Sequence, residues 1–196
     1  ATQGSVFHDP KDREPVTFVV DNTPIEEHRG ILVKREDLCC AEVPLSKARG
    51  AWSHIAARPE NHIAVVDTYR SLNGLVTAAA AKRLGKLCTI FRPKYKADTG
   101  LAPHHRRALD LGATVRDLPA GRQRVMNALA RRALPDAYFM PAAFRLEETA
   151  TAAGGELQAT LTRVGSVDLL VVPVGTGTHL RGLVGVASCD VVGVLG

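Results

Sequence analysis

The stretch IAVVDTYRSLNGLVTAAAAKRLGKLCTIF, residues 63–91, decides the fold. It opens with an apolar, β-branched run, passes through a polar loop into an alanine-rich segment that ends at Gly85, and closes on a second apolar run. β-Branched runs favour strands, whereas alanine-rich segments followed by glycine favour helices. The stretch therefore predicts a β-α-β unit with two parallel strands.

The same alternation extends over most of the chain. Strands are expected at residues 16–20, 31–37, 63–67, 87–91, 113–118, 137–140, 167–174 and 190–196, and helices at residues 46–57, 74–84, 103–111, 122–133, 147–162 and 179–186. The strand VDLLVVPV at 167–174 has no polar alternation, which predicts burial of both its faces. We expect an α/β fold of parallel sheets with helices on both faces.

Composition is that of a globular protein. The 196 residues suit one domain or two lobes, and 45% hydrophobic with 23% charged residues supports a packed core. No apolar run approaches the roughly 20 residues of a membrane helix. Residues 1–15 are polar, lack the pattern of a signal peptide, and are expected to form a flexible arm. The four cysteines include no CxxC pair, which indicates reduced thiols and a cytoplasmic location.

Much of the net charge of +5 comes from a basic stretch at residues 92–132. Such a stretch fits a polyanionic partner such as nucleic acid, but it is also typical of a solvated helical face. No zinc-finger, RNP or helix-turn-helix pattern accompanies it. The adjacent His104 and His105 cannot share one helix face as the histidines of an HExxH zinc site do, so no metal site is expected.

Three loops carry candidate functional residues, because ligands bind beyond the carboxyl ends of parallel strands. In the first loop, KREDL (34–38) is followed by Lys47, in the first turn of a helix that Ser46 is expected to cap. A cation is disfavoured near the positive end of a helix, so this position should lower the pKa of Lys47, as a Schiff-base lysine requires. An ordinary surface lysine is the alternative interpretation.

The second and third loops both precede an expected helix. In residues 67–74, Ser71 can cap the helix, Asn73 can donate hydrogen bonds, and the free N–H groups of the helix start can bind a carboxylate. In the third loop, the glycines, N–H groups and hydroxyls of residues 175–178 suit a phosphate. Simple capping and a tight turn without a ligand remain the alternatives.

The order of these segments resembles the fold-type II pyridoxal-phosphate (PLP) family, which includes tryptophan synthase beta chains, threonine deaminases, cysteine synthases and cyclopropane-carboxylate deaminases. The matching segments are Thr23-Pro24, KREDL, the K-x-R-G-A of Lys47, the S-x-N-G of residues 71–74, residues 79–85, residues 112–115, Gly155-Glu156 and the loop 175–178. The resemblance covers roughly residues 20 to 196. It implies the tryptophan synthase beta-like fold over 16–196, with a small lobe at about residues 50–140 inserted in a larger lobe.

The resemblance also implies residue roles. Lys47 would hold PLP as a Schiff base and move the α-proton of the substrate, with Ser71 as the second catalytic residue. Asn73 would contact the cofactor ring oxygen, and Ser71, Leu72 and Asn73 would bind the substrate carboxylate. The cofactor phosphate would be cradled by Gly175, Thr176, Gly177 and Thr178. The implied activity is that of a homodimeric lyase or transferase that eliminates, replaces or deaminates at a small amino acid.

The sequence departs from the family at several positions. Leu72 replaces a common glycine, and Thr178 and His179 stand where relatives often have glycine. We also expect the chain to lack the family's C-terminal segment, which contacts the pyridine nitrogen. Reaction and substrate therefore stay open.

The alternative hypothesis is a specialised or non-catalytic relative that binds nucleic acid or a protein partner. An enzyme acting on an amino acid attached to a polyanion would combine the two. A nucleotide binder and a hydrolase are weaker alternatives, because the chain has no Walker lysine and no GxSxG motif.

Overall fold

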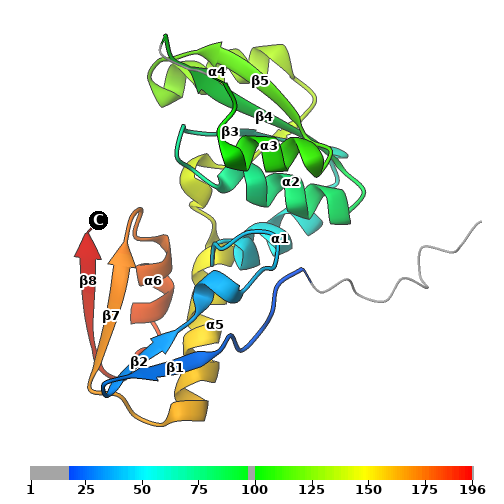
Figure 1. The fold of residues 1–196 in the computed structure, drawn as a ribbon. Coiled ribbons are helices and arrows are strands. Elements are labelled where there is room, and N and C mark those ends of the chain that lie inside the picture. The colour runs from blue at the N-terminus through cyan, green and yellow to red at the C-terminus, as the bar shows by residue number, and fades with distance from the viewer. Residues whose placement is uncertain (1–17, 97–99, 196) are drawn as a thin grey trace, which may run out of the picture.

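A computed structural model describes residues 18–96 and 100–195, and Figure 1 shows their arrangement. The arm expected at residues 1–15 lies outside the described residues, as do the first two residues of the strand expected at 16–20. A four-stranded sheet with its helices lies at one end of the molecule. Two two-stranded sheets lie at the other end, beside a long helix (Figure 1).

The four-stranded sheet has the order β5-β4-β3-β6, and all its neighbouring strands are parallel. The strands are β3 (His62–Val66), β4 (Leu87–Lys94), β5 (Thr114–Pro119) and β6 (Tyr138–Phe139), and the connecting helices are α2 (Asn73–Arg83), α3 (Pro103–Asp110) and α4 (Gln123–Ala133). The β-α-β unit predicted for residues 63–91 is thus confirmed as β3-α2-β4.

Helices cover both faces of this sheet because the side chains of β3 alternate. Ile63 and Val65 belong to a buried cluster that includes the alanines of α2. Ala64 and Val66 point to the other face, where they pack with Met126 of α4. The two-sided covering expected from the sequence is therefore present, and it leaves the carboxyl edge of the sheet for the loops that follow the strands.

The N-terminal region contains an antiparallel hairpin in place of a parallel strand. β1 (Ile25–His28) and β2 (Ile31–Lys34) pair across Arg29 and Gly30, whose φ angles are 54° and 80°. Two successive positive φ angles match a tight hairpin turn, and glycine adopts the second without strain. The strand expected at 31–37 therefore ends at Lys34. Residues 18–20 of the strand expected at 16–20 do not form a strand.

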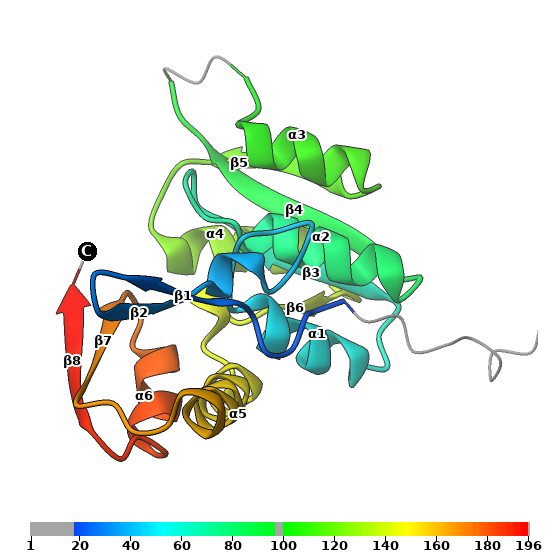
Figure 2. The same ribbon diagram turned by 60° about the horizontal axis from the view of Figure 1, so that its bottom comes forward.

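The last two strands form a separate parallel pair, β7 (Leu169–Val174) and β8 (Asp190–Leu195). α6 (Thr178–Val184) connects them and packs on α5 (Glu147–Val164), as Figure 2 shows. The expected burial of both faces of the strand at 167–174 is wrong in this structure. Among the described residues helices cover only one face of the pair, and exposed apolar side chains remain at Leu169, Val171, Val192, Val194 and Leu195.

α1 (Ala48–Ala56) lies between the two ends of the molecule and contacts both α2 and α5. Its Gly50 packs directly on the backbone of Thr149 in α5, where a β-carbon would not fit. This close packing fixes the start of α1 and therefore the position of Lys47, the residue just before it. In the part of the chain that the structure describes, no helix combines the length and apolarity needed to cross a membrane.

Candidate functional site

Lys47 immediately precedes α1 and points toward segments far away in the sequence. Its Nζ donates a hydrogen bond to the carbonyl oxygen of Ala143 at 2.7 Å and lies 3.4 Å from Oγ1 of Thr176. Ala143 belongs to a short 3-10 helix (Ala142–Phe144), and its φ of 56° is rare for a residue with a side chain. Such strained backbone is often found at functional sites. Here it presents a carbonyl to the lysine.

The pKa of Lys47 lies below its ordinary value. Burial is the main cause, and the charge of Arg145 adds to it. The direction agrees with the expectation from the sequence, which did not include burial or Arg145 as causes. A lowered pKa increases the fraction of neutral amine at a given pH, and the neutral amine is the form that attacks a carbonyl carbon.

The loop of residues 175–178 connects β7 to α6 and lies next to Lys47 through Thr176. The left-handed φ of 75° at Gly177 turns the chain into α6, and the hydroxyls of Thr176 and Thr178 are 3.0 Å apart. A β-carbon at Gly175 or Gly177 would meet no heavy atom within 4 Å. The space beside this backbone is therefore free for a bound group.

His179 is a residue of this site that the sequence analysis noted only as a departure from the family. Its Nε2 lies 3.0 Å from Oγ of Ser46, the residue before Lys47. The expected capping of α1 by Ser46 is therefore wrong, because this hydroxyl pairs with the imidazole and makes no cap hydrogen bond. Burial, followed by the charge of Lys47, holds the pKa of His179 below its ordinary range.

Replacing Lys47 with methionine is expected to raise the pKa of His179 in the cofactor-free protein. Removing a nearby positive charge makes the imidazolium less unfavourable, so protonation should occur at higher pH. NMR titration of the histidine ring protons measures the change. His62 is a matched control, because burial and Arg116 lower its pKa. An unchanged pKa of His179, or an equal rise of the pKa of His62, would contradict the placement of Lys47 beside His179.

Ser71 and Leu72 lie between β3 and α2 at the carboxyl edge of the four-stranded sheet, and Asn73 is the first residue of α2. The Asn73 N–H donates to Oγ of Ser71 at 3.1 Å. The expected capping by Ser71 is nevertheless wrong in position, because Leu72 is the N-cap residue of α2 and makes no side-chain cap hydrogen bond. Leu72 packs against the buried core of this half. Within residues 18–96 and 100–195, no hydrogen bond joins Lys47 to Ser71 or Asn73.

Asp67 fixes the shape of this loop although the sequence analysis gave it no role. Its two carboxylate oxygens accept the N–H groups of Thr68 and Gly74, each at 2.9 Å. A β-carbon at Gly74 would collide with this carboxylate and with Ile90, so the close approach requires glycine. The position of this aspartate directly after a buried strand was the signal available in the sequence.

The KREDL motif forms a network of ion pairs that supports the lysine. Lys34 Nζ lies 2.8 Å from Oε2 of Glu156, and Arg49 bridges Glu36 at 3.2 Å and Glu156 at 3.0 Å. The network ties β2, α1 and α5 together. Arg49 is two residues from Lys47, so these charges hold the start of α1 in place.

The chain is similar in sequence to known proteins. Residues 16–187 match the family model described as pyridoxal-phosphate dependent enzyme. The chain is 37% identical over 180 residues to the glycyl-dTMP PLP-dependent decarboxylase of Pseudomonas phage M6, covering 85% of this chain and 64% of that protein. The chain therefore spans just under two thirds of the length of this relative.

Solved structures show the same fold at lower identity. Threonine deaminase isoform 2 from Solanum lycopersicum superposes with a TM-score of 0.75 at 18% identity, over 92% of this chain and 52% of that one. Cysteine synthase from Entamoeba histolytica superposes with a TM-score of 0.68 at 16% identity, over 93% and 60%. The expected tryptophan synthase beta-like fold class is confirmed.

Proposed function

Because the chain belongs to the family of pyridoxal-phosphate-dependent enzymes, we propose that it decarboxylates an amino acid attached to a thymidine nucleotide. The observation that carries the proposal is the 37% identity to a glycyl-dTMP decarboxylase over 85% of this chain. The elimination, replacement or deamination of a free amino acid expected from the sequence has support only from structures such as threonine deaminase, at 18% identity. That similarity concerns the fold.

The residues of the site fit PLP. Lys47 supplies a half-buried amine with a lowered pKa, which can bond to the cofactor aldehyde. Thr176 lies within 3.4 Å of that amine, and the free space at Gly175 and Gly177 suits the cofactor phosphate. Asn73 is the residue assigned to the cofactor ring by family resemblance.

Decarboxylation breaks the bond between the α-carbon and the carboxylate, releases CO₂, and places a proton on the α-carbon. When bound, PLP supplies the electron sink for the pair left by the broken bond. Lys47 Nζ is the proton donor in this scheme, since an ammonium held near the α-carbon can deliver a proton to it. Ser71 and the start of α2 orient the carboxylate before it leaves.

Two exposed tyrosines, one in the loop of residues 67–74 and one just after β4, support a nucleotide-linked substrate. Tyr69 and Tyr95 are 46% and 49% exposed, and their ring centroids lie 6.2 Å apart at an interplanar angle of 79°. The exposed cations Arg70 and Lys96 are their sequence neighbours. Nucleic-acid bases stack on aromatic rings, and cationic side chains pair with phosphates, so this surface suits the nucleotide part of the substrate.

The reaction is tested with PLP-loaded protein and a thymidine nucleotide whose glycyl group keeps its free amine and α-carboxylate. Mass spectrometry is expected to show a nucleotide that has lost the carboxylate, with one equivalent of CO₂ and no ammonia. Ammonia release from free serine or threonine, without CO₂ from the nucleotide, would instead support elimination or deamination of a free amino acid. Absence of both products would overturn the proposed reaction.

Replacing Tyr69 with alanine should raise KM for the nucleotide substrate about tenfold while kcat changes little, because stacking contributes about 1–3 kcal/mol per base. Tyr69→Phe keeps the ring and should restore KM. Steady-state kinetics on the three proteins decide the outcome. Equal KM values for Tyr69→Ala and the wild type would remove the tyrosine pair from substrate binding.

A further inference from the structure

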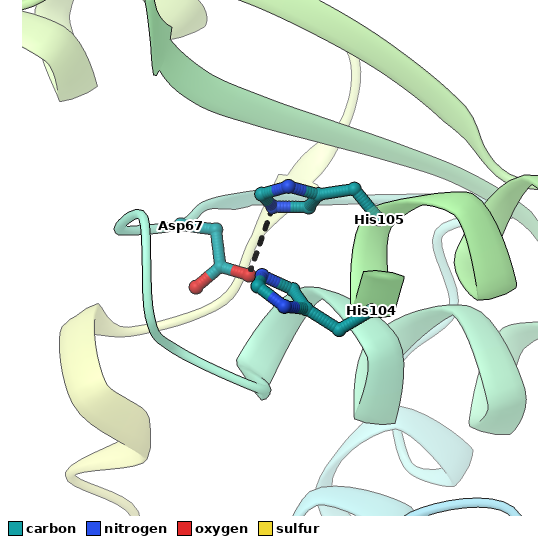
Figure 3. A group of neighbouring side chains, drawn as sticks. All are labelled: Asp67, His104 and His105. Carbon is teal, nitrogen blue, oxygen red and sulfur yellow. Dashed lines mark ion pairs between the residues drawn. The ribbon is translucent and has the colours of Figure 1, made fainter. Parts of the chain in front are cut away.

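Three side chains with metal-binding atoms converge at the carboxyl end of β3 (Figure 3). They are Asp67, which directly follows the strand, and His104 and His105 in the first turn of α3. One candidate ligand atom from each residue lies within 4.8 Å of the other two. Asp67 and His105 are almost completely buried, at 1% and 0% exposure.

Buried nitrogens of both histidines lack hydrogen-bond partners among the described residues. Among the described residues, neither Nδ1 nor Nε2 of His105 has a hydrogen-bond partner, and buried Nε2 of His104 also lacks one. Nε2 of His105 lies 3.8 Å from Oδ2 of Asp67, which is too long for a hydrogen bond. Buried polar atoms are nearly always satisfied, and leaving one unpaired costs about 1–3 kcal/mol. Each imidazole can offer one nitrogen to a given ion, so buried unpaired nitrogens on both rings beside one carboxylate point to a missing ligand.

The local geometry explains why adjacent histidines can act together. The centroids of the two imidazole rings lie 4.1 Å apart, and the rings make an interplanar angle of 51°. Both rings face Asp67 (Figure 3). The sequence predicted no metal site because adjacent histidines cannot share one helix face, but at this helix start both rings reach Asp67. Asp67 is already oriented by the N–H groups of Thr68 and Gly74, as metal-binding carboxylates commonly are.

We propose that Asp67, His104 and His105 bind one divalent transition-metal ion of the Zn²⁺ type. Two imidazoles and one carboxylate form a donor set typical of zinc and its neighbours, whereas Mg²⁺ and Ca²⁺ prefer oxygen ligands. Ligand atoms around tetrahedral zinc are about 3.4 Å apart, as bond lengths near 2.1 Å require. The 3.8 Å between His105 Nε2 and Asp67 Oδ2 is close to this value, and the other separations, which are at most 4.8 Å, would have to close further on binding.

The bound ion would connect α3 to the loop that carries the substrate-binding residues. Asp67 holds the N–H of Gly74, which follows Asn73 at the start of α2. The metal would fix this loop against α3, so its role is structural positioning. None of the three ligands is among the residues that hold PLP, so zinc binding can be measured without the proposed reaction.

Zinc binding to the chelator-treated, cofactor-free full chain tests the proposal. Isothermal titration and elemental analysis after dialysis are expected to give one Zn²⁺ per chain. His104→Ala should bind at least about tenfold more weakly, since losing a ligand costs more than losing an outer-shell partner. His28→Ala is the matched control, because His28 is exposed on the β1–β2 hairpin. It should bind zinc like the wild type.

Thermal unfolding supplies a second readout that is independent of enzyme activity. Zinc that binds the folded state raises the unfolding midpoint of the wild type and of His28→Ala, but should leave His104→Ala nearly unchanged. His104 is only partly buried, so its replacement should keep the fold and decide the question even where Asp67→Asn does not fold. Zinc binding to the wild type no higher than background would overturn the proposal. Equal zinc affinity of His104→Ala and the wild type would overturn it as well.

Discussion

Lys47→Ala is expected to lose the visible absorbance of bound cofactor and to lower kcat/KM by about 10³-fold or more. The variant removes both the amine that bonds to the cofactor and the proton donor of the reaction. The hydrogen bond to the Ala143 carbonyl and the approach to Thr176 are lost with it. Absorbance of the PLP-loaded protein and steady-state kinetics on the nucleotide substrate measure the two effects.

Lys82→Ala is the control for this experiment, since Lys82 is an exposed lysine in the last turn of α2. It should keep the absorbance band and the activity. Circular dichroism should show that Lys47→Ala remains folded, because the ammonium lies at the edge of α1 and not in the core. A Lys47→Ala protein with wild-type absorbance and activity would remove this lysine from the chemistry.

Gly182→Ala is expected to destabilise the protein strongly, by about 3 kcal/mol at the upper end of the range for overpacked sites. A β-carbon at Gly182 in α6 would overlap the carbonyl oxygen of Ala150 in α5. The clash is with backbone, which cannot move aside as a flexible side chain can. α6 also begins at Thr178, so displacing it should move the loop that is assigned to the cofactor phosphate and weaken PLP binding.

The matched control is Gly155→Ala in α5, where a β-carbon meets nothing within 4 Å. Alanine is the better helix former, so this variant should gain about 0.5–1 kcal/mol. Urea denaturation measures the free energy of unfolding of both variants, and PLP titration measures cofactor affinity. Equal stability of Gly182→Ala and Gly155→Ala would contradict the close packing of α5 on α6.

Local patterns were enough to predict the strands and helices that make up the four-stranded sheet. The segment at 63–91 combines a buried strand, an alanine-rich helix and a stop at Gly85, and each signal is contained within a few residues. β1 was missed because IEEH carries two glutamates and a histidine among only four residues. The exposure of Val171 was missed because a run of apolar residues shows what can be buried, while the neighbours in space decide what is buried.

The site was predictable where its residues lie in one loop and less so where distant segments meet. Ser71, Asn73 and the loop 175–178 follow strands, so the carboxyl-edge rule locates them. The contact between Ser46 and His179 spans 133 positions, and local capping rules gave the serine a different role. Asp67, His104 and His105 converge because α3, which packs on α2 and β5, begins near the residue that follows β3. No spacing along the chain displays this packing.

Borohydride reduction of the PLP-loaded wild-type chain, followed by peptide mapping by mass spectrometry, tests most directly whether this chain holds its cofactor at Lys47. Reduction makes the bond between the lysine amine and the cofactor permanent, so the modified residue can be read from the fragments. We expect one cofactor per chain, attached to the peptide that contains Lys47. Attachment at another lysine, or no attachment in folded protein, would contradict it.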